Sequence, residues 1–217
     1  MLYFRSIETL RHTRLDELLH ELAPELDARG FTKRPGLPAW ARDHPRGLLT
    51  IALSYAPDDE EGGWIEPFVG LIDQTVETQL AAHAKLTNSS GPRHTLLIGS
   101  TRWFEPTLDR QPAHSRSEAL EVANAVLRWW TRALPVFVTG YGESRRQLDT
   151  LFNTDHPQAG QYLQHELYRS LRGLAIRKQT NPGRLTEALG FHRERMQPTG
   201  YWDIYGEQIR AFAMAIG

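Results

Sequence analysis

The order of strand and helix patterns constrains the fold of this chain more than any single motif. Alternating apolar residues, typical of strands, fall in the first half of its 217 residues, and helical spacing dominates the second half. Strands grouped before helices are typical of an α+β fold. We therefore predict a single α+β domain over residues 1–217, with a sheet-rich part over about residues 1–110 and a helical part over about residues 117–217.

The clearest strand signal is Leu48–Tyr55, in which apolar residues alternate with small or polar ones. That period of two predicts a strand buried on one face. We expect the other strands at Trp40–Asp43, Trp64–Ile72 and His94–Thr101. Pro67 would place its strand at a sheet edge or a bulge, because proline cannot donate to a ladder. Together these segments predict an antiparallel β-meander.

Amphipathic helices are predicted before, within and after this meander, and we expect the helical C-terminal half to pack on the sheet. The expected ranges are Ser6–Arg29, Thr75–Lys85, Ser117–Leu134, Ser144–Asn153, Gln158–Ile176, Arg184–Leu189 and Asp203–Ile216. In Ser117–Leu134, the inward stripe includes Val122, Val126 and Trp130. It leaves Trp129 about 100° away around the helix axis. Pro135 is expected to end or kink this helix.

Composition excludes several classes of protein. The formal net charge is −1, from 25 basic and 26 acidic residues, which argues against general attraction to nucleic acid or an anionic membrane. The chain has no cysteine, so disulfides, thiolate metal sites and a cysteine nucleophile are excluded. Neither a signal-peptide core nor a run of apolar residues of membrane-spanning length is present. We therefore expect a cytoplasmic protein.

No residue pattern predicts a catalytic site. The nine histidines are scattered singly and form no zinc-binding spacing, so we expect no metal and no cofactor, although a site assembled from distant segments stays open. Gly99-Ser100-Thr101 lacks the second glycine of a nucleophile elbow. Gly140-Tyr141-Gly142 resembles a phosphate cradle but lacks a fingerprint's third glycine, so we interpret it as a flexible connection between helices.

The C-terminal helices carry a cluster of basic residues with aromatic residues among them. Its members are Arg169, Arg172, Arg177, Lys178, Arg184, Arg193 and Arg195. Such a cluster permits a nucleic-acid surface, but the solvated faces of amphipathic helices explain it equally well. The six tryptophans are most simply core residues, and one or two exposed ones would mark an interface.

The order of elements resembles that of the bacterial family catalogued as domain of unknown function 4304. The resemblance covers about residues 7–155. It rests on Gly30-Phe31, Trp40 and Arg42, the strand from Phe68 to Asp73, the Ala133–Phe137 stretch and the helix start at Ser144. The family brings no established reaction. Small bacterial domains of this kind occur among toxin-neutralising immunity proteins, so the resemblance implies a protein that binds another protein.

We therefore predict a non-enzymatic, protein-binding domain, with a toxin as the first candidate partner. The alternatives are an enzyme or small-ligand-binding protein with a site between sheet and helices, and a protein that binds nucleic acid through the basic helices. Asp58, Asp59, Glu60 and Glu61 lie together on a predicted turn between two strands. Four adjacent carboxylates create a local negative field that would steer a basic partner, so these residues are the predicted contact. The sequence does not indicate the oligomeric state.

Overall fold

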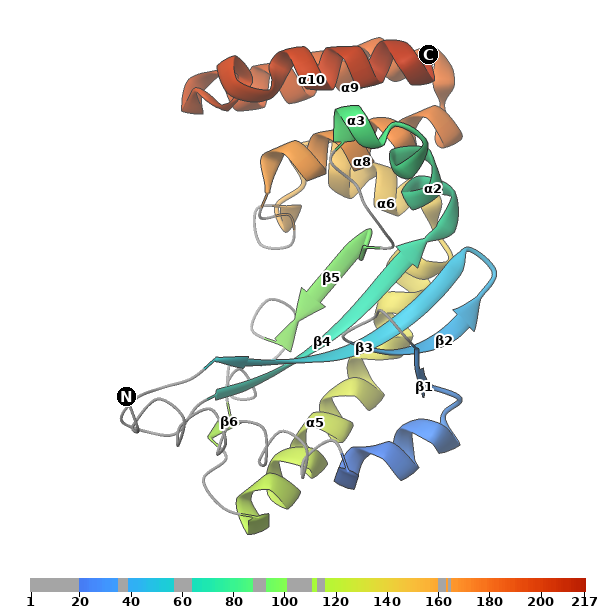
Figure 1. Ribbon diagram of the computed structural model, residues 1–217, viewed down its shortest axis with the longest axis vertical. Helices are drawn as coiled ribbons and strands as arrows, with labels where there is room; N and C mark the ends of the chain where they lie inside the picture. The colour runs from blue at the N-terminus through green and yellow to red at the C-terminus, as the bar shows by residue number, and fades with distance from the viewer. Residues whose placement is uncertain are drawn as a thin grey trace. The chain divides into compact units, whose positions relative to one another are not determined.

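The computed structural model describes residues 20–34, 39–56, 64–87, 93–100, 111–112, 116–159, 163 and 165–217. An N-terminal helix, an antiparallel sheet and helices in the C-terminal half confirm the predicted α+β class (Figure 1). The chain divides into two compact units. Unit 1 comprises Met1–Asp43, Leu49–Gly70 and Leu97–Val136, and unit 2 comprises His44–Leu48, Leu71–Leu96 and Phe137–Gly217.

The sheet has the strand order β1-β2-β3-β4-β5, with a short β6 that pairs with β4. The strands are β1 (Thr32–Lys33), β2 (Trp40–His44), β3 (Gly47–Ala56), β4 (Trp64–Asp73), β5 (Leu96–Gly99) and β6 (Gln111–Pro112). Thr32 lies opposite Ala41, and Trp64 lies opposite Pro112. The predicted strands are therefore present, and β1 and β6 are short strands beyond the four predicted ones.

Two expectations about the strands are wrong. In β3, Thr50 and Ala52 are buried like Leu49 and Ile51, so this stretch is covered on both faces rather than on one. For Pro67, the edge alternative is wrong, because β4 pairs with β3, β5 and β6, whereas the bulge alternative stays a prediction. Period-two spacing reports which residues share a face, but it does not report whether a second layer covers the other face.

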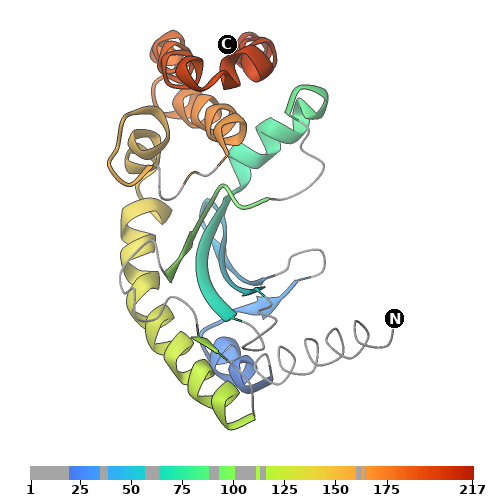
Figure 2. The same cartoon turned by 90° about the vertical axis from the view of Figure 1, so that its left-hand side faces the viewer.

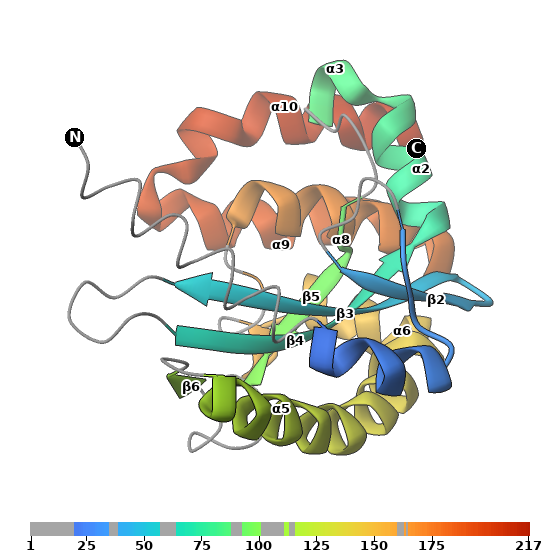
Figure 3. The same cartoon turned by 60° about the horizontal axis from the view of Figure 1, so that its bottom comes forward.

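In unit 1, two helices lie side by side on the sheet (Figure 3). The first covers residues 20–28, buries Leu22 and Leu26, and ends at Gly30, whose φ of +75° suits glycine. The second is α5 (Arg116–Phe137). The guanidinium of Arg29 donates to Thr131 Oγ1 at 2.8 Å, and Trp130 Nε1 of α5 donates to Phe68 O of β4 at 3.0 Å.

The prediction for the faces of α5 is wrong at Trp129, which is as fully buried as Trp130, each with 1% of its surface exposed. Trp129 follows Val122 by seven residues, which places the two only about 20° apart around the helix. The buried face of α5 is therefore wider than the predicted stripe. Pro135 does not end the helix, since α5 continues to Phe137. Pro135 and Thr131 are both exposed, so water can reach the Thr131 carbonyl that lacks the usual N–H donor.

Unit 2 is built around α8 (Glu166–Thr180), which contacts α2, α6, α9 and α10 (Figure 2, where α8 to α10 are orange to red). The surrounding helices are α2 (Gln74–Ala82), α3 (Ala84–Thr87), α6 (Arg145–Asn153), α9 (Leu185–Met196) and α10 (Tyr201–Ile216). Short turns η3 (Pro182–Arg184) and η4 (Gln197–Thr199) connect the last three. The predicted continuous helix Gln158–Ile176 is wrong, because Ala159 is helical but Leu163 and His165 are not, and α8 begins at Glu166. In the part of the chain that the model describes, no helix combines the length and apolarity needed to cross a membrane.

Candidate functional site

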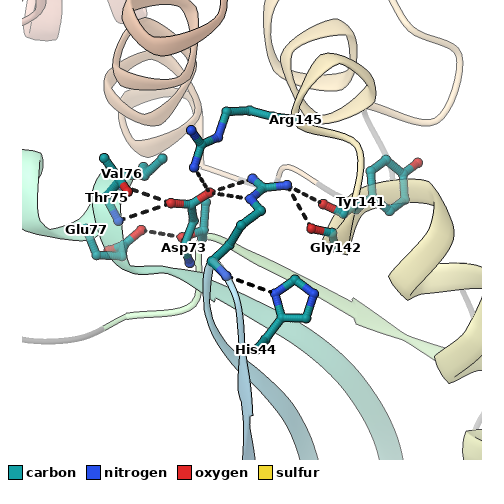
Figure 4. A network of polar contacts seen from close by, with 10 residues as sticks. His44, Asp73, Thr75, Val76, Glu77, Tyr141, Gly142 and Arg145 are labelled. Carbon is teal, nitrogen blue, oxygen red and sulfur yellow. Dashed lines mark hydrogen bonds and ion pairs between the residues drawn. The ribbon is translucent and has the colours of Figure 1, made fainter.

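The most extensive polar network in unit 2 centres on the buried carboxylate of Asp73, where β4 ends and α2 begins (Figure 4). Asp73 Oδ1 caps α2 by accepting the backbone N–H groups of Thr75 at 3.1 Å and Val76 at 3.3 Å. Asp73 Oδ2 accepts Arg46 Nε at 2.9 Å, and Arg145 Nη2 approaches it at 3.4 Å. One carboxylate thus forms a close ion pair with Arg46, contacts Arg145 at longer range and satisfies a helix N-terminus.

Arg46 also connects Asp73 to the turn that follows α5. Its Nη1 donates to the carbonyl oxygens of Tyr141 at 2.9 Å and Gly142 at 3.0 Å. Residues Val138–Gly142 form a π-helical turn that connects α5 to α6, and the flexibility of this connection stays a prediction. These carbonyls are hydrogen-bond acceptors directed at a cation, whereas a phosphate cradle presents backbone N–H donors. The glycine pair therefore serves a guanidinium site.

A second buried carboxylate extends this network. Thr95 Oγ1 accepts the backbone N–H of Asp73 at 2.9 Å and donates to Glu77 Oε1 at 2.8 Å. Arg172 binds the same carboxylate through both oxygens, with Nε at 2.9 Å from Oε1. Because guanidinium, hydroxyl or amide donors occupy the oxygens of Asp73 and Glu77, the arrangement is suited to holding elements together rather than to proton transfer.

A third network is buried between α6, α8 and α9. His192 lies 2.9 Å from Asn153 Oδ1, while Asn153 Nδ2 donates to Gly173 O at 2.9 Å and to Asp149. Since Asn153 Oδ1 accepts, we assign the proton of the neutral ring to His192 Nε2. Burial, with the nearby Arg169, Arg195 and Arg177 as further causes, lowers the pKa of His192 to about 3.

The basic cluster of α8 and α9 is mostly engaged within unit 2. Arg172 pairs with Glu77, Arg177 with Asp149, and Arg195 with Glu166. Arg169 is buried and donates to the carbonyls of Phe152 and Thr154, and burial lowers its pKa to about 10. All three acidic partners lie at least 28 residues along the chain from the arginines they bind, so the local sequence made the segment look more basic than it is.

Exposed and half-buried side chains, most of them aromatic, form a surface where α8 and α10 begin, which we call the tyrosine surface. It consists of His165, Tyr168, Tyr201, Ile204 and Tyr205. The ring of His165 lies 4.9 Å from that of Tyr168 and 6.2 Å from that of Tyr205, and Tyr201 stacks on Tyr205 at 6.2 Å. Ile204 is 68% exposed and Tyr201 is 44% exposed.

Arginine side chains hold one end of the tyrosine surface in place. The guanidinium of Arg93 lies over the Tyr168 ring at 5.4 Å, and its Nη1 donates to the Tyr168 hydroxyl at 2.8 Å. Arg172 approaches the same ring at 5.6 Å. Tyr201, Ile204 and Tyr205 share one side of α10 at steps of three and four residues, a spacing that the sequence analysis did not use as an interface signal.

The model leaves the predicted partner contact untested, because Asp58, Asp59, Glu60 and Glu61 lie outside the described residues. Trp40, Trp129, Trp130 and Trp202 are buried, so none of these four forms the exposed interface that tryptophan was expected to mark. Among the residues whose positions are described, no three His, Asp or Glu side chains are grouped as a metal ion would require.

Comparison of the chain with models of protein families, with curated proteins and with solved structures gives no match. The resemblance to the domain of unknown function 4304 family therefore stays a prediction.

Proposed function

We propose that this protein is a non-enzymatic binding domain that engages a protein partner through the tyrosine surface. The observation that carries the proposal is the chain of contacting rings His165, Tyr168, Tyr205 and Tyr201 beside the exposed Ile204. Tyrosine and arginine are enriched among residues that dominate protein-binding energy, because they bury a large area with few rotatable bonds.

The rigidity of this surface also favours binding. Tyr168 is held by the Arg93 hydrogen bond and has two guanidinium groups close to its ring, so it would lose little rotamer freedom when a partner covers it. The first candidate partner is a toxin, which is the class implied by the resemblance. The acidic turn Asp58–Glu61 stays a predicted steering contact for a basic region of that partner.

The pairing of buried carboxylates with arginines bears on the two alternative functions, an enzyme and a nucleic-acid-binding protein. The buried carboxylates Asp73 and Glu77 are held by arginines, which does not favour an acid–base role for them. The same pairing of arginines gives little support to a nucleic-acid surface on α8 and α9.

The test compares Ile204→Asp with Met214→Asp. Both residues are exposed apolar positions on α10, at 68% and 77%, but only Ile204 belongs to the tyrosine surface. Proteins captured from source cells by the wild type would be identified by mass spectrometry, and the purified pair measured by calorimetry. We expect Ile204→Asp to weaken binding by at least about 30-fold, equivalent to about 2 kcal/mol at a central contact.

The control variant Met214→Asp should bind as the wild type does, and both variants should keep the wild-type circular dichroism spectrum. Equal affinity of the two variants for every captured protein would rule out the tyrosine surface as the interface. Changing Asp58–Glu61 to the corresponding amides would then show whether the acidic turn alters the association rate at low salt.

A further inference from the structure

A second site lies among the helices of unit 2 and shares no residue with the tyrosine surface. A cavity of about 590 Å³ is lined by α6, by the C-terminal end of α8 and by η3. Its volume is within the range of about 300–1,000 Å³ that is typical of small-molecule sites. Every side chain that lines it is charged or polar, and we call it the arginine pocket.

The charge of the arginine pocket is strongly unbalanced. Arg145, Arg146, Arg177 and Arg184 line it, whereas Asp149 is its single carboxylate. Asp149 Oδ1 is bound by Arg177 Nε at 2.9 Å and also accepts Asn153 Nδ2, so its charge is already compensated. With Arg177 paired to Asp149, the guanidinium groups of Arg145, Arg146 and Arg184 remain. The residues that line the cavity include no second carboxylate to balance them.

Arg145, Arg146 and Arg184 form only weak interactions, or none, with other described residues of the protein. No hydrogen bond or ion pair engages the Arg146 side chain within the described residues, and Arg146 is exposed. Arg184 pairs with Glu187, but both side chains are more than half exposed, and such surface pairs contribute little. Arg145 contacts Asp73 at 3.4 Å, while its Nε is buried without a partner in the described part of the chain.

Gln179 provides an independent indication of a ligand. It lines the same cavity, and neither its amide oxygen nor its amide nitrogen has a hydrogen-bond partner among the described residues, although both atoms are buried. Buried amide atoms are nearly always satisfied in native proteins, because leaving them unpaired is costly. Both groups lie just beneath the surface of the cavity, so a polar ligand would satisfy them once the side chains of Gln179 and Arg145 turn toward it.

We propose that the arginine pocket binds a small, highly polar phosphate, such as a diphosphate or a sugar phosphate. Guanidinium groups match phosphate oxygens with paired, charge-assisted hydrogen bonds, and a multiply charged phosphate balances several arginines at once. The lining has no aromatic or aliphatic side chain on which a base could stack, which disfavours a nucleotide. Gln179 and Asn181 provide amide donors and acceptors suited to hydroxyl groups.

The experiment is calorimetric titration of the full-length protein with inorganic pyrophosphate, comparing Arg146→Gln with Arg193→Gln. Arg193 is an exposed arginine of α9 outside the cavity, so it serves as the matched control. Wild type and Arg193→Gln should bind alike, and Arg146→Gln should bind at least about ten-fold more weakly through loss of one charge-assisted contact. Binding should also weaken as salt is added.

A second variant separates ligand binding from folding. Gln179→Met keeps the side-chain length and removes both unpaired atoms, so it should preserve or raise the melting temperature of the free protein. It should also diminish the rise in melting temperature that pyrophosphate produces in the wild type. Citrate, included as a multiply charged carboxylate, should bind more weakly than pyrophosphate.

Three results would overturn the proposal. The first is no heat and no melting shift with the wild type at millimolar pyrophosphate. The second is identical binding by Arg146→Gln and Arg193→Gln. The third is citrate binding as tight as that of pyrophosphate, which would show a site for anions in general rather than one for phosphates.

Discussion

At the scale of single residues, Asp73 shows how much one buried carboxylate can organise. It caps α2 and holds Arg46, and Arg46 in turn binds the carbonyls of Tyr141 and Gly142. The Asp73–Arg46 pair therefore links three segments that are remote in sequence: the start of α2, the residue Arg46 and the turn at Tyr141 and Gly142. Removing only the carboxylate of a buried ion pair leaves the cation without a counter-ion. This lowers the free energy of unfolding far more than loss of a surface ion pair does.

Asp73→Asn should therefore lower the free energy of unfolding by about 3–5 kcal/mol, because the variant leaves Arg46 buried without its counter-ion. Urea unfolding followed by circular dichroism would measure the loss. Asp43→Asn is the control, since Asp43 also pairs with an arginine but is 86% exposed. We expect that control to change stability by less than about 1 kcal/mol, and equal losses in the two variants would contradict the proposed role of Asp73.

Gly173 in α8 shows a second effect at this scale. A Cβ at this position would lie 2.6 Å from Asn153 Oδ1 and 2.7 Å from His192 Nε2, so it would separate the two hydrogen-bonded side chains. Gly173→Ala should therefore destabilise the protein by about 1–3 kcal/mol despite the better helix propensity of alanine. Its matched control is Gly190→Ala in α9, where a Cβ meets nothing within 4 Å. That change should be neutral or stabilise by up to about 1 kcal/mol, as measured by thermal unfolding.

At the scale of elements, α5 illustrates how packing widens a helical face. Trp129 and Trp130 are consecutive, yet both are buried, because the covered arc of the helix extends from Ala125 to Ala123 through Val126. The indole nitrogens of the two tryptophans differ in their hydrogen bonding. Trp130 Nε1 donates to Phe68 O, whereas Trp129 Nε1 has no acceptor among the described residues.

Trp129→Ala and Trp130→Ala should each lower stability by about 3–5 kcal/mol, because each removes a fully buried tryptophan. Substitution by phenylalanine should lower stability by different amounts at the two positions. Trp130→Phe also loses a buried hydrogen bond, so it should cost about 1 kcal/mol more than Trp129→Phe, which removes an unpaired donor. Chemical denaturation of the four variants would measure these differences, and a near-neutral Trp129→Ala would show that its indole is not in the core.

At the scale of the whole molecule, two histidines kept neutral by burial link stability to pH. The pKa of His192 is lowered to about 3 by burial and nearby arginines, and the pKa of His94 is lowered to about 4 by burial and then by Arg172. In the unfolded chain both should titrate near about 6.5. Below that pH the unfolded state binds protons that the folded state does not, so the folded state loses relative stability.

The free energy of unfolding should therefore not depend on these two histidines above about pH 7. It should fall as the pH is lowered from about 6.5 toward 4, by about 1.4 kcal/mol per pH unit for each histidine. Urea unfolding at a series of pH values would measure the slope. Replacing His192 with glutamine, which retains a donor for Asn153, should make the slope shallower by the contribution of one histidine. An unchanged slope would mean that His192 is not the buried, neutral group described.

What the sequence determined by itself is the set of elements whose signals are local. The alternation around Leu49 and Ile51, the helical spacing that starts at Ser144 and the stripe through Val122 and Val126 predicted β3, α6 and most of α5, because periodicity depends on neighbours a few residues away.

Only the tertiary structure decided which distant groups meet. The pairing of Arg172 with Glu77, the convergence of Arg46 on the turn at Gly142 and the burial of Trp129 depend on which elements pack together. The candidate sites follow the same rule. The rings of Tyr168 and Tyr205 and the guanidinium groups of Arg146 and Arg184 belong to separate elements, so no spacing along the chain places them side by side. Local patterns specify the elements, whereas charge compensation and burial are properties of their packing.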